Sequence, residues 1–203
     1  ASIGLSPAQV EALRVLWSGL RSADGSVMYE GLGYGDLTAG AAIYARFGLG
    51  HLRYVVHSDP QWLPAGGRFD VERDLPAVRA VLEGRYQFSA SVGGLAQYLR
   101  EGRKLLLWHG ADDPIISHRD MIRTWADVVG AAGAQAARAN SRLYIAPGVA
   151  HCGGGEGADS ADLLQAMMQW VEAGKAPGTL LAAKRDAATG TVRFHPLHHR
   201  LQQ

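Results

Sequence analysis

The stretch GRKLLLWHGADDPIIS, Gly102 to Ser117, decides the fold class of this sequence. Its run Lys104–Trp108 is short and mostly apolar, which is the pattern of a strand buried on both faces. A helix-like segment from about His118 to Arg138 follows, and Arg142–Ala146 is a second run of the same buried type. Strand, helix and strand in this order form a parallel crossover unit, which is almost always right-handed. The sequence therefore predicts an α/β fold with parallel strands and crossover helices.

Candidate catalytic groups stand just past the end of each predicted strand. Asp112 and Asp113 come after the first strand, and His151 comes after the second, in the stretch YIAPGVAHCGGG. Ligands and catalysis in open α/β sheets are found at the carboxyl ends of the strands, so we expect these groups within hydrogen-bond reach. A carboxylate on one imidazole nitrogen leaves the other nitrogen free to take a proton from a nucleophile. The arrangement predicts the acid and base of a catalytic triad.

The remaining segments predict helices, loops and one hairpin. A final helix is expected from about Ser160 to Ala173, followed by a closing hairpin of Thr179–Lys184 and Thr191–Phe194. The first hundred residues are expected to form helices and irregular loops. One helix should start at Ser6-Pro7, and three more should cover Ala39–Phe47, Asp70–Gly84 and Ser91–Arg100. The glycine-rich stretch Gly31–Gly35 lacks a preceding strand and phosphate-loop spacing, which indicates turn chemistry.

Composition excludes several classes of partner. The 203 residues carry 20 Lys and Arg against 19 Asp and Glu, and no basic block accumulates, so neither nucleic acid nor an anionic membrane is expected. The longest apolar run is far too short to span a bilayer, and the first residues do not form a signal peptide. The single cysteine, Cys152, cannot form a disulfide within the chain.

The nucleophile that such an acid and base would serve is not evident. No G-x-S-x-G elbow occurs in the sequence, and the first hundred residues contain no obvious parallel strand to carry one. We therefore expect that part of the enzyme, including its serine, lies outside this chain.

Several stretches together resemble the C-terminal part of the tannase and feruloyl esterase family of α/β-hydrolases, from Leu5 to about Pro196. The strings H-G-x-x-D-P and P-G-x-x-H-C-x-G-G, in this order, are the most specific. The matching pieces are LSPAQVEALRVLWSGLRSADG (Leu5–Gly25), GRKLLLWHGADDPIIS (Gly102–Ser117), APGVAHCGGG (Ala146–Gly155), WVEAGKAPGTLLAAK (Trp170–Lys184) and DAATGTV (Asp186–Val192).

The resemblance implies roles for three residues. Asp113 rather than Asp112 would be the triad acid, and His151 would be the general base and then the general acid. Cys152 would form a disulfide with a cysteine immediately before the nucleophilic serine, in an upstream segment of the same protein. Two further cysteines of the family are replaced here by Gly4 and His198.

The resemblance also implies the organisation of the whole protein. Residues 1–100 would be the later part of a lid domain and residues 101–203 the C-terminal part of the α/β-hydrolase core. This chain would bind no cofactor, whereas a calcium ion could bind in the upstream lid region, and the protein would be secreted or periplasmic. Cutting a core sheet exposes apolar surface, so we also expect self-association.

The implied function is hydrolysis of phenolic-acid esters of the feruloyl, chlorogenate or galloyl type by a serine esterase, with the isolated chain inactive. Trp62 is the candidate for contact with an aromatic substrate. Two alternatives remain: a non-catalytic α/β binding or interaction domain, and a metal site formed by His109, Asp113 and His151. The histidines at 195, 198 and 199 have no acidic partner nearby in sequence and are read as solvated rather than as metal ligands.

Overall fold

The computed structural model describes residues 4–33, 35, 40, 43, 47–85 and 91–200. Its centre is a pair of parallel strands, β3 (Leu105–Gly110) and β4 (Ser141–Ala146), in register from Leu105 opposite Ser141 to Gly110 opposite Ala146. The predicted crossover joins them as two helices, α5 (His118–Ala132) and α6 (Ala134–Asn140). The single helix expected over this segment is interrupted because Gly133 has a positive φ of 87°.

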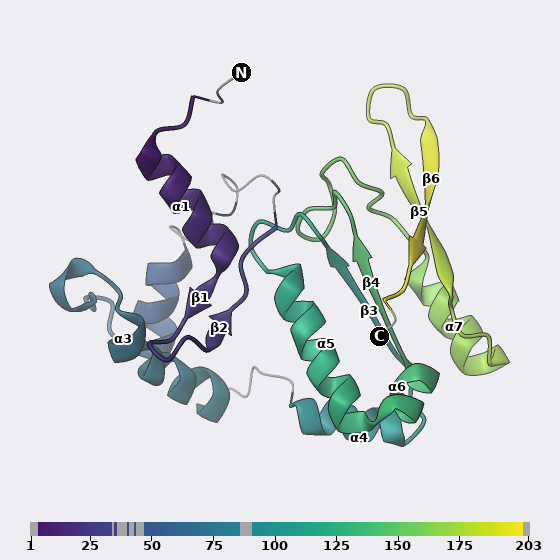
Figure 1. Ribbon diagram of the computed structural model, residues 1–203, viewed down its shortest axis with the longest axis horizontal. Helices are drawn as coiled ribbons and strands as arrows, with labels where there is room; N and C mark the ends of the chain where they lie inside the picture. Colours follow the sequence, from purple (N-terminus) through teal and green to yellow (C-terminus); the bar gives the residue numbers. More distant parts are fainter. Residues whose placement is uncertain are drawn as a thin grey trace.

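The two faces of β4 belong to different parts of the core. Leu143 packs with Trp125 and Val129 of α5, whereas Tyr144 packs with residues of the C-terminal hairpin. Figure 1 shows α5 on one side of the strand pair and α7 with the hairpin on the other. Burial differs between the strands, since β4 is mostly buried and β3 is half-buried except at Gly110. The expectation of complete burial is therefore wrong for β3, whose only strand neighbour among the described residues is β4.

The C-terminal part follows the sequence prediction closely. Helix α7 (Leu163–Ala173) is capped by the Asp162 carboxylate, which accepts a hydrogen bond from the Gln165 amide, and it ends at Gly174 in the left-handed conformation. Strands β5 (Thr179–Arg185) and β6 (Val192–His198) form the expected antiparallel hairpin. Strand β6 continues past the predicted end at Phe194 and accommodates Pro196 opposite Leu181.

The first hundred residues are mostly helical or irregular. Helix α1 (Pro7–Ser18) begins with a capping box of Ser6 and Gln9 and precedes a small antiparallel pair that the sequence did not predict. The other elements are β1 (Leu20–Arg21), β2 (Val27–Tyr29), the π-helical turns η1 (Leu52–Val56) and η3 (Ala80–Arg85), the 3-10 turn η2 (Ala65–Gly67), α3 (Val71–Arg79) and α4 (Val92–Arg100). Most of the helix predicted over 39–47 lies outside the described residues.

This N-terminal segment is anchored to the start of α5. Ser117, the buried N-cap of α5, donates from its hydroxyl to the Gly31 carbonyl at 2.6 Å and from its amide to the Tyr29 hydroxyl at 2.8 Å. Helix α4, on the lid side of the predicted boundary at residue 100, shares a buried cluster with α5 through Ala96, Leu99 and Val128. The boundary itself stays a prediction. No helix in the described ranges is both long enough and apolar enough to cross a bilayer.

Candidate active site at the tips of the parallel strands

Asp113 lies in a tight turn directly after β3 and is almost completely buried, with 4% of its surface exposed. Its Oδ1 atom accepts hydrogen bonds from the amides of Ile115 at 2.8 Å and Ile116 at 3.0 Å. Burial alone raises the pKa of Asp113, but the hydrogen bonds from the Ile116 amide, the His151 ring and the Ile115 amide together hold it below its ordinary value. The fold therefore keeps a buried carboxylate ionised at neutral pH.

The turn after β3 and the loop after β4 are hydrogen-bonded to each other. The Ala111 amide donates to the Ala146 carbonyl at 2.9 Å, and the Asp112 amide donates to the Val149 carbonyl at 3.0 Å. The two backbones approach so closely at Gly110 that a Cβ there would lie 2.3 Å from the Val149 oxygen. Because these hydrogen bonds join the two loops directly after the paired strands, the strands set the positions of the acid and the base.

The structure brings Asp113 and His151 together, as the sequence predicts. His151 Nδ1 lies 2.8 Å from Asp113 Oδ2, across 38 residues of sequence. An ionised carboxylate can only accept a hydrogen bond, so Nδ1 carries the proton and Nε2 of the neutral ring has a free lone pair. The His151 side chain is 38% exposed, which leaves that ring accessible to a reacting group. The pair has the geometry of the acid and base of a triad.

The loop that carries His151 is a closed turn rather than a flexible link. The Ala150 amide donates to the Gly154 carbonyl at 3.3 Å, and Val149 forms an isolated antiparallel bridge with Gly155. Gly155 has a φ of +75°, and a Cβ there would lie 2.3 Å from the Gly148 oxygen, so this position needs glycine. Cys152, beside the base, is exposed and has a positive φ of 61°. Cys152 is therefore accessible to solvent at the position next to the base.

Sequence reasoning missed the role of the glycines between Gly31 and Gly40. A Cβ on Gly33 would lie 2.1 Å from the Ala111 oxygen, and one on Gly40 would lie 2.1 Å from the Pro114 oxygen. These glycines allow the N-terminal segment to contact the backbone of the acid turn, whereas the sequence indicated only turn chemistry. Three glycines in five residues without strand or phosphate-loop context could have signalled such a close approach.

An apolar groove runs beside the acid turn, between that turn and the segment α1–β2. It has a volume of about 550 Å³. Ile115 and Ile116, the residues whose amides hold Asp113, form one side of it. The other lining residues are Val15, Leu16, Gly19, Leu20, Tyr29 and Leu32. The groove is large enough for an aromatic ring with a short side chain.

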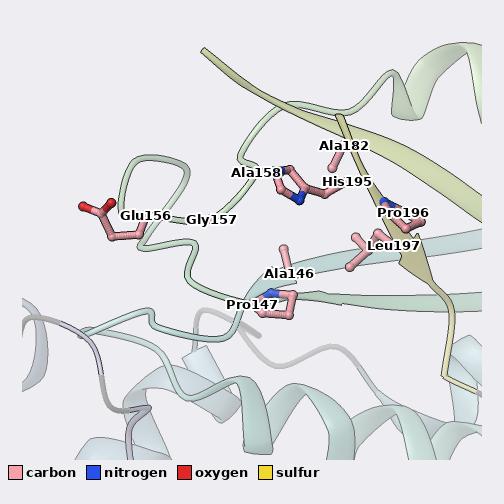
Figure 2. A pocket seen from close by; sticks show the side chains of 9 residues that line it. All are labelled: Ala146, Pro147, Glu156, Gly157, Ala158, Ala182, His195, Pro196 and Leu197. Atoms are coloured by element: carbon pink, nitrogen blue, oxygen red, sulfur yellow. The ribbon is translucent and has the colours of Figure 1, made fainter. Parts of the chain in front are cut away.

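A smaller pocket of about 270 Å³ lies on the side of the C-terminal hairpin, between the end of β4 and the segment that follows the base loop. Figure 2 shows the imidazole of His195 at this pocket and the carboxylate of Glu156 pointing away from it. Neither Asp113 nor His151 lines the pocket.

Trp62, the predicted substrate contact, has described contacts only within the N-terminal segment. Its ring stacks on His57, with centroids 4.1 Å apart, and its carbonyl accepts a hydrogen bond from Arg53 at 2.9 Å. It does not line the groove beside the acid turn. A substrate contact by Trp62 stays a prediction.

The alternative of a metal site gains no support from the geometry. Across the described residues, no three or more His, Cys, Asp and Glu side chains are arranged to hold a metal ion. His151 Nδ1 is hydrogen-bonded to Asp113 Oδ2 at 2.8 Å and His109 Nε2 lies 3.4 Å from the same oxygen, so both rings face one carboxylate.

Comparison with known proteins identifies the family. The family model described as tannase and feruloyl esterase matches residues 78–200, which include both strand tips and the whole Asp113–His151 pair. This chain belongs to the tannase and feruloyl esterase family. The match confirms the resemblance seen in the sequence motifs.

Proteins with similar sequences are named as feruloyl esterases. The chain is 29% identical to a probable feruloyl esterase B-2 of Aspergillus terreus and 27% identical to feruloyl esterase B of Aspergillus niger, in each case over 97% of this chain and 40% of the relative. The chain thus spans about 40% of the length of these relatives.

Solved structures confirm the fold class. An esterase from Aspergillus oryzae superposes with a TM-score of 0.81 at 23% identity, over 96% of this chain and 42% of that structure. Feruloyl esterase B from the same organism superposes with a TM-score of 0.74 at 25% identity over the same shares. The fold is part of an α/β-hydrolase-like fold with a mostly helical and irregular N-terminal segment.

Proposed function

We propose that this chain supplies the acid and the base of a serine carboxylic-ester hydrolase that acts on esters of phenolic acids. The observation that carries the proposal is the 2.8 Å contact between His151 Nδ1 and the buried Asp113 carboxylate, with the His151 side chain 38% exposed. Family membership and the names of the relatives support the choice of ester chemistry.

In the proposed reaction, a serine hydroxyl attacks the ester carbonyl carbon while His151 Nε2 takes the hydroxyl proton. Asp113 holds the ring and stabilises the imidazolium that forms. The imidazolium then gives its proton to the departing alcohol, which leaves an acyl-enzyme. Water attacks the acyl-enzyme by the same route, with His151 as the base, and the free acid and the serine are restored.

The serine is proposed to come from a segment outside these 203 residues, because no G-x-S-x-G elbow occurs within them. Cys152 is proposed to pair with a cysteine next to that serine. Its exposure and its position beside His151 support this pairing, since a disulfide there would tie the base loop to the nucleophile. By the same resemblance we propose that the protein is secreted or periplasmic.

The groove beside the acid turn supports an aromatic acyl group in the substrate. Ile115 and Ile116 connect the groove to the triad acid through their amides. A feruloyl, galloyl or caffeoyl ring bound in this groove would lie against apolar side chains while its ester carbonyl faced the reacting groups.

The test uses the protein that contains both this chain and the proposed serine. His151→Ala and Asp113→Asn are each expected to lower kcat on methyl ferulate, methyl gallate and chlorogenate by about 10⁴-fold, as for other triads. His198→Ala, an exposed histidine on β6, is the matched control and should keep full activity. The chain alone should be inactive. Normal turnover by His151→Ala would exclude the proposal, and no esterase activity in any form would favour a non-catalytic binding domain.

A further inference from the structure

Asp113 Oδ2 has a second imidazole neighbour besides His151. His109, near the end of β3, places Nε2 3.4 Å from this oxygen, and its side chain is only 10% exposed. Three nitrogen donors are hydrogen-bonded to the carboxylate, and His109 Nε2 is a fourth nitrogen nearby. The Ile115 and Ile116 amides lie on Oδ1, and the His151 and His109 rings lie on Oδ2.

The same His109 nitrogen also contacts the far end of the acid turn. Nε2 lies 3.0 Å from the Ile116 carbonyl oxygen. A carbonyl oxygen is an acceptor only, so His109 must carry its proton on Nε2 and donate it to Ile116, and this N–H lies beside the Asp113 carboxylate. This donor links the end of the strand to the end of the turn, and Asp113 lies between these two ends.

Each oxygen of Asp113 thus has a separate means of restraint. The amides of Ile115 and Ile116 hold Oδ1, while Oδ2 is hydrogen-bonded to His151 and has His109 Nε2 3.4 Å away. Without the His109 donor, the Ile116 carbonyl loses this hydrogen bond, and the buried Oδ2 loses the N–H dipole beside it. An acid turn with fewer fixed hydrogen bonds moves more freely, and the geometry of a proton transfer is sensitive to shifts of about 1 Å.

We propose that His109 is a positioning residue, which acts through its Nε2–H to fix the acid turn and the orientation of Asp113 toward His151. This inference rests on the proposed function for its kinetic consequence, but the geometric consequence stands apart from it. His109 does not touch the reacting atoms. Its effect reaches them through the carboxylate.

Two amide substitutions distinguish the effect of losing the Nε2–H donor from the effect of losing the packing of the ring. In His109→Gln the amide nitrogen can occupy the place of Nε2, whereas in His109→Asn the amide ends one bond short, near the place of Nδ1. Both variants replace the ring by a neutral amide, so the loss of ring packing is similar. His198→Gln and His198→Asn, on the exposed face of β6, are the matched controls.

The first readout is independent of activity. The Nδ1–H proton of His151, hydrogen-bonded to Asp113, should give a downfield NMR signal in histidine-labelled chain, assigned by its loss in His151→Gln. We expect this signal to persist in His109→Gln and in both controls, and to be lost by exchange with water in His109→Asn. Persistence in His109→Asn would overturn the inference, whatever the esterase assays show.

The second readout is kinetic, in the complete enzyme. We expect kcat of His109→Asn to fall about 10- to 100-fold with KM within about twofold, and kcat of His109→Gln to stay within about threefold of the parent. Equal losses in both variants, in the NMR signal or in kcat, would assign the role to the shape of the ring and overturn the donor role. If His151→Ala leaves esterase activity normal while the NMR result holds, only the proposed function fails.

Discussion

Lys184 and Asp159 form an ion pair of 3.3 Å that fastens the loop carrying His151 to strand β5. The Lys184 ammonium also donates to the Gly155 carbonyl at 2.7 Å, and the Asp159 carboxylate accepts from the Gly154 amide at 2.8 Å. Burial raises the pKa of Asp159, but the Gly154 amide and Lys184 outweigh burial and lower it. The pair therefore stabilises the loop that carries His151 through contacts at Gly154 and Gly155.

Lys184→Met is expected to loosen the base loop with little effect on global stability. Partly exposed ion pairs contribute about 0–1 kcal/mol to folding, so the free energy of unfolding should change by no more than that. Hydrogen exchange at the Gly154 amide should accelerate about tenfold, because its acceptor Asp159 loses its partner. Arg14→Met, which removes an exposed ion pair with Glu11 on α1, is the control and should leave the Gly154 amide unchanged. Unchanged exchange in Lys184→Met would show that the pair does not hold the loop.

Gly33→Ala is expected to destabilise the fold at the acid turn. The new Cβ would lie 2.1 Å from the Ala111 oxygen, and the Ala111 backbone is held by its hydrogen bond to the Ala146 carbonyl. We expect a loss of about 2–4 kcal/mol in urea unfolding followed by circular dichroism. Gly130→Ala, in the interior of α5 with open space around it, is the control and should raise stability by about 0.5–1 kcal/mol. Equal stability of the two variants would contradict the close approach.

His118 should make the chain less stable in mild acid. Burial is the largest cause that lowers its pKa below the ordinary 6.5, and the positive charge of Arg119 adds to it. The unfolded chain therefore binds a proton near pH 6.5 that the folded chain resists, so stability is full above that pH and falls as the pH is lowered through it. His118→Phe should flatten the decline in unfolding free energy between about pH 6.5 and 5. A slope identical to the parent's would show that His118 is not the group responsible.

We expect the chain to self-associate through α7. Leu164, Met168 and Val171 lie on one face of this helix at helical spacing and are 71%, 42% and 62% exposed. Exposed apolar side chains in such a row favour contact with another apolar surface. Sedimentation velocity should show oligomers at high concentration, and the double variant Leu164→Gln and Val171→Gln should shift them toward monomer. Tyr54→Gln, a similarly exposed residue on η1, should not. A monomeric parent at every concentration would remove the expectation.

The sequence was informative where a local pattern and a topological rule agreed. Two buried-type strands with a helical crossover require their carboxyl ends to meet, so the proximity of Asp113 and His151 followed from the pattern alone. The hairpin β5–β6 and the start of α1 at Ser6-Pro7 were predicted from local chemistry in the same way.

The features that the sequence did not predict depend on contacts between distant segments. Gly33 must be glycine because its backbone approaches Ala111 closely. The role proposed for His109 depends on the positions of Asp113 and Ile116. Neither contact leaves a periodic signal, because each involves a single position. Trp62 was selected for its aromatic ring in a loop, and the local stack on His57 could not be foreseen from spacing.

The hydrogen bonds from Ala111 and Asp112 to the β4 loop have an evolutionary consequence. One inserted residue within either strand would displace one tip by about 3.3 Å and pull the proton donor and acceptor out of reach. An insertion in α5 or α6 changes neither tip. Among descendants of this sequence, length variation should therefore accumulate in the crossover and be absent from the two strands.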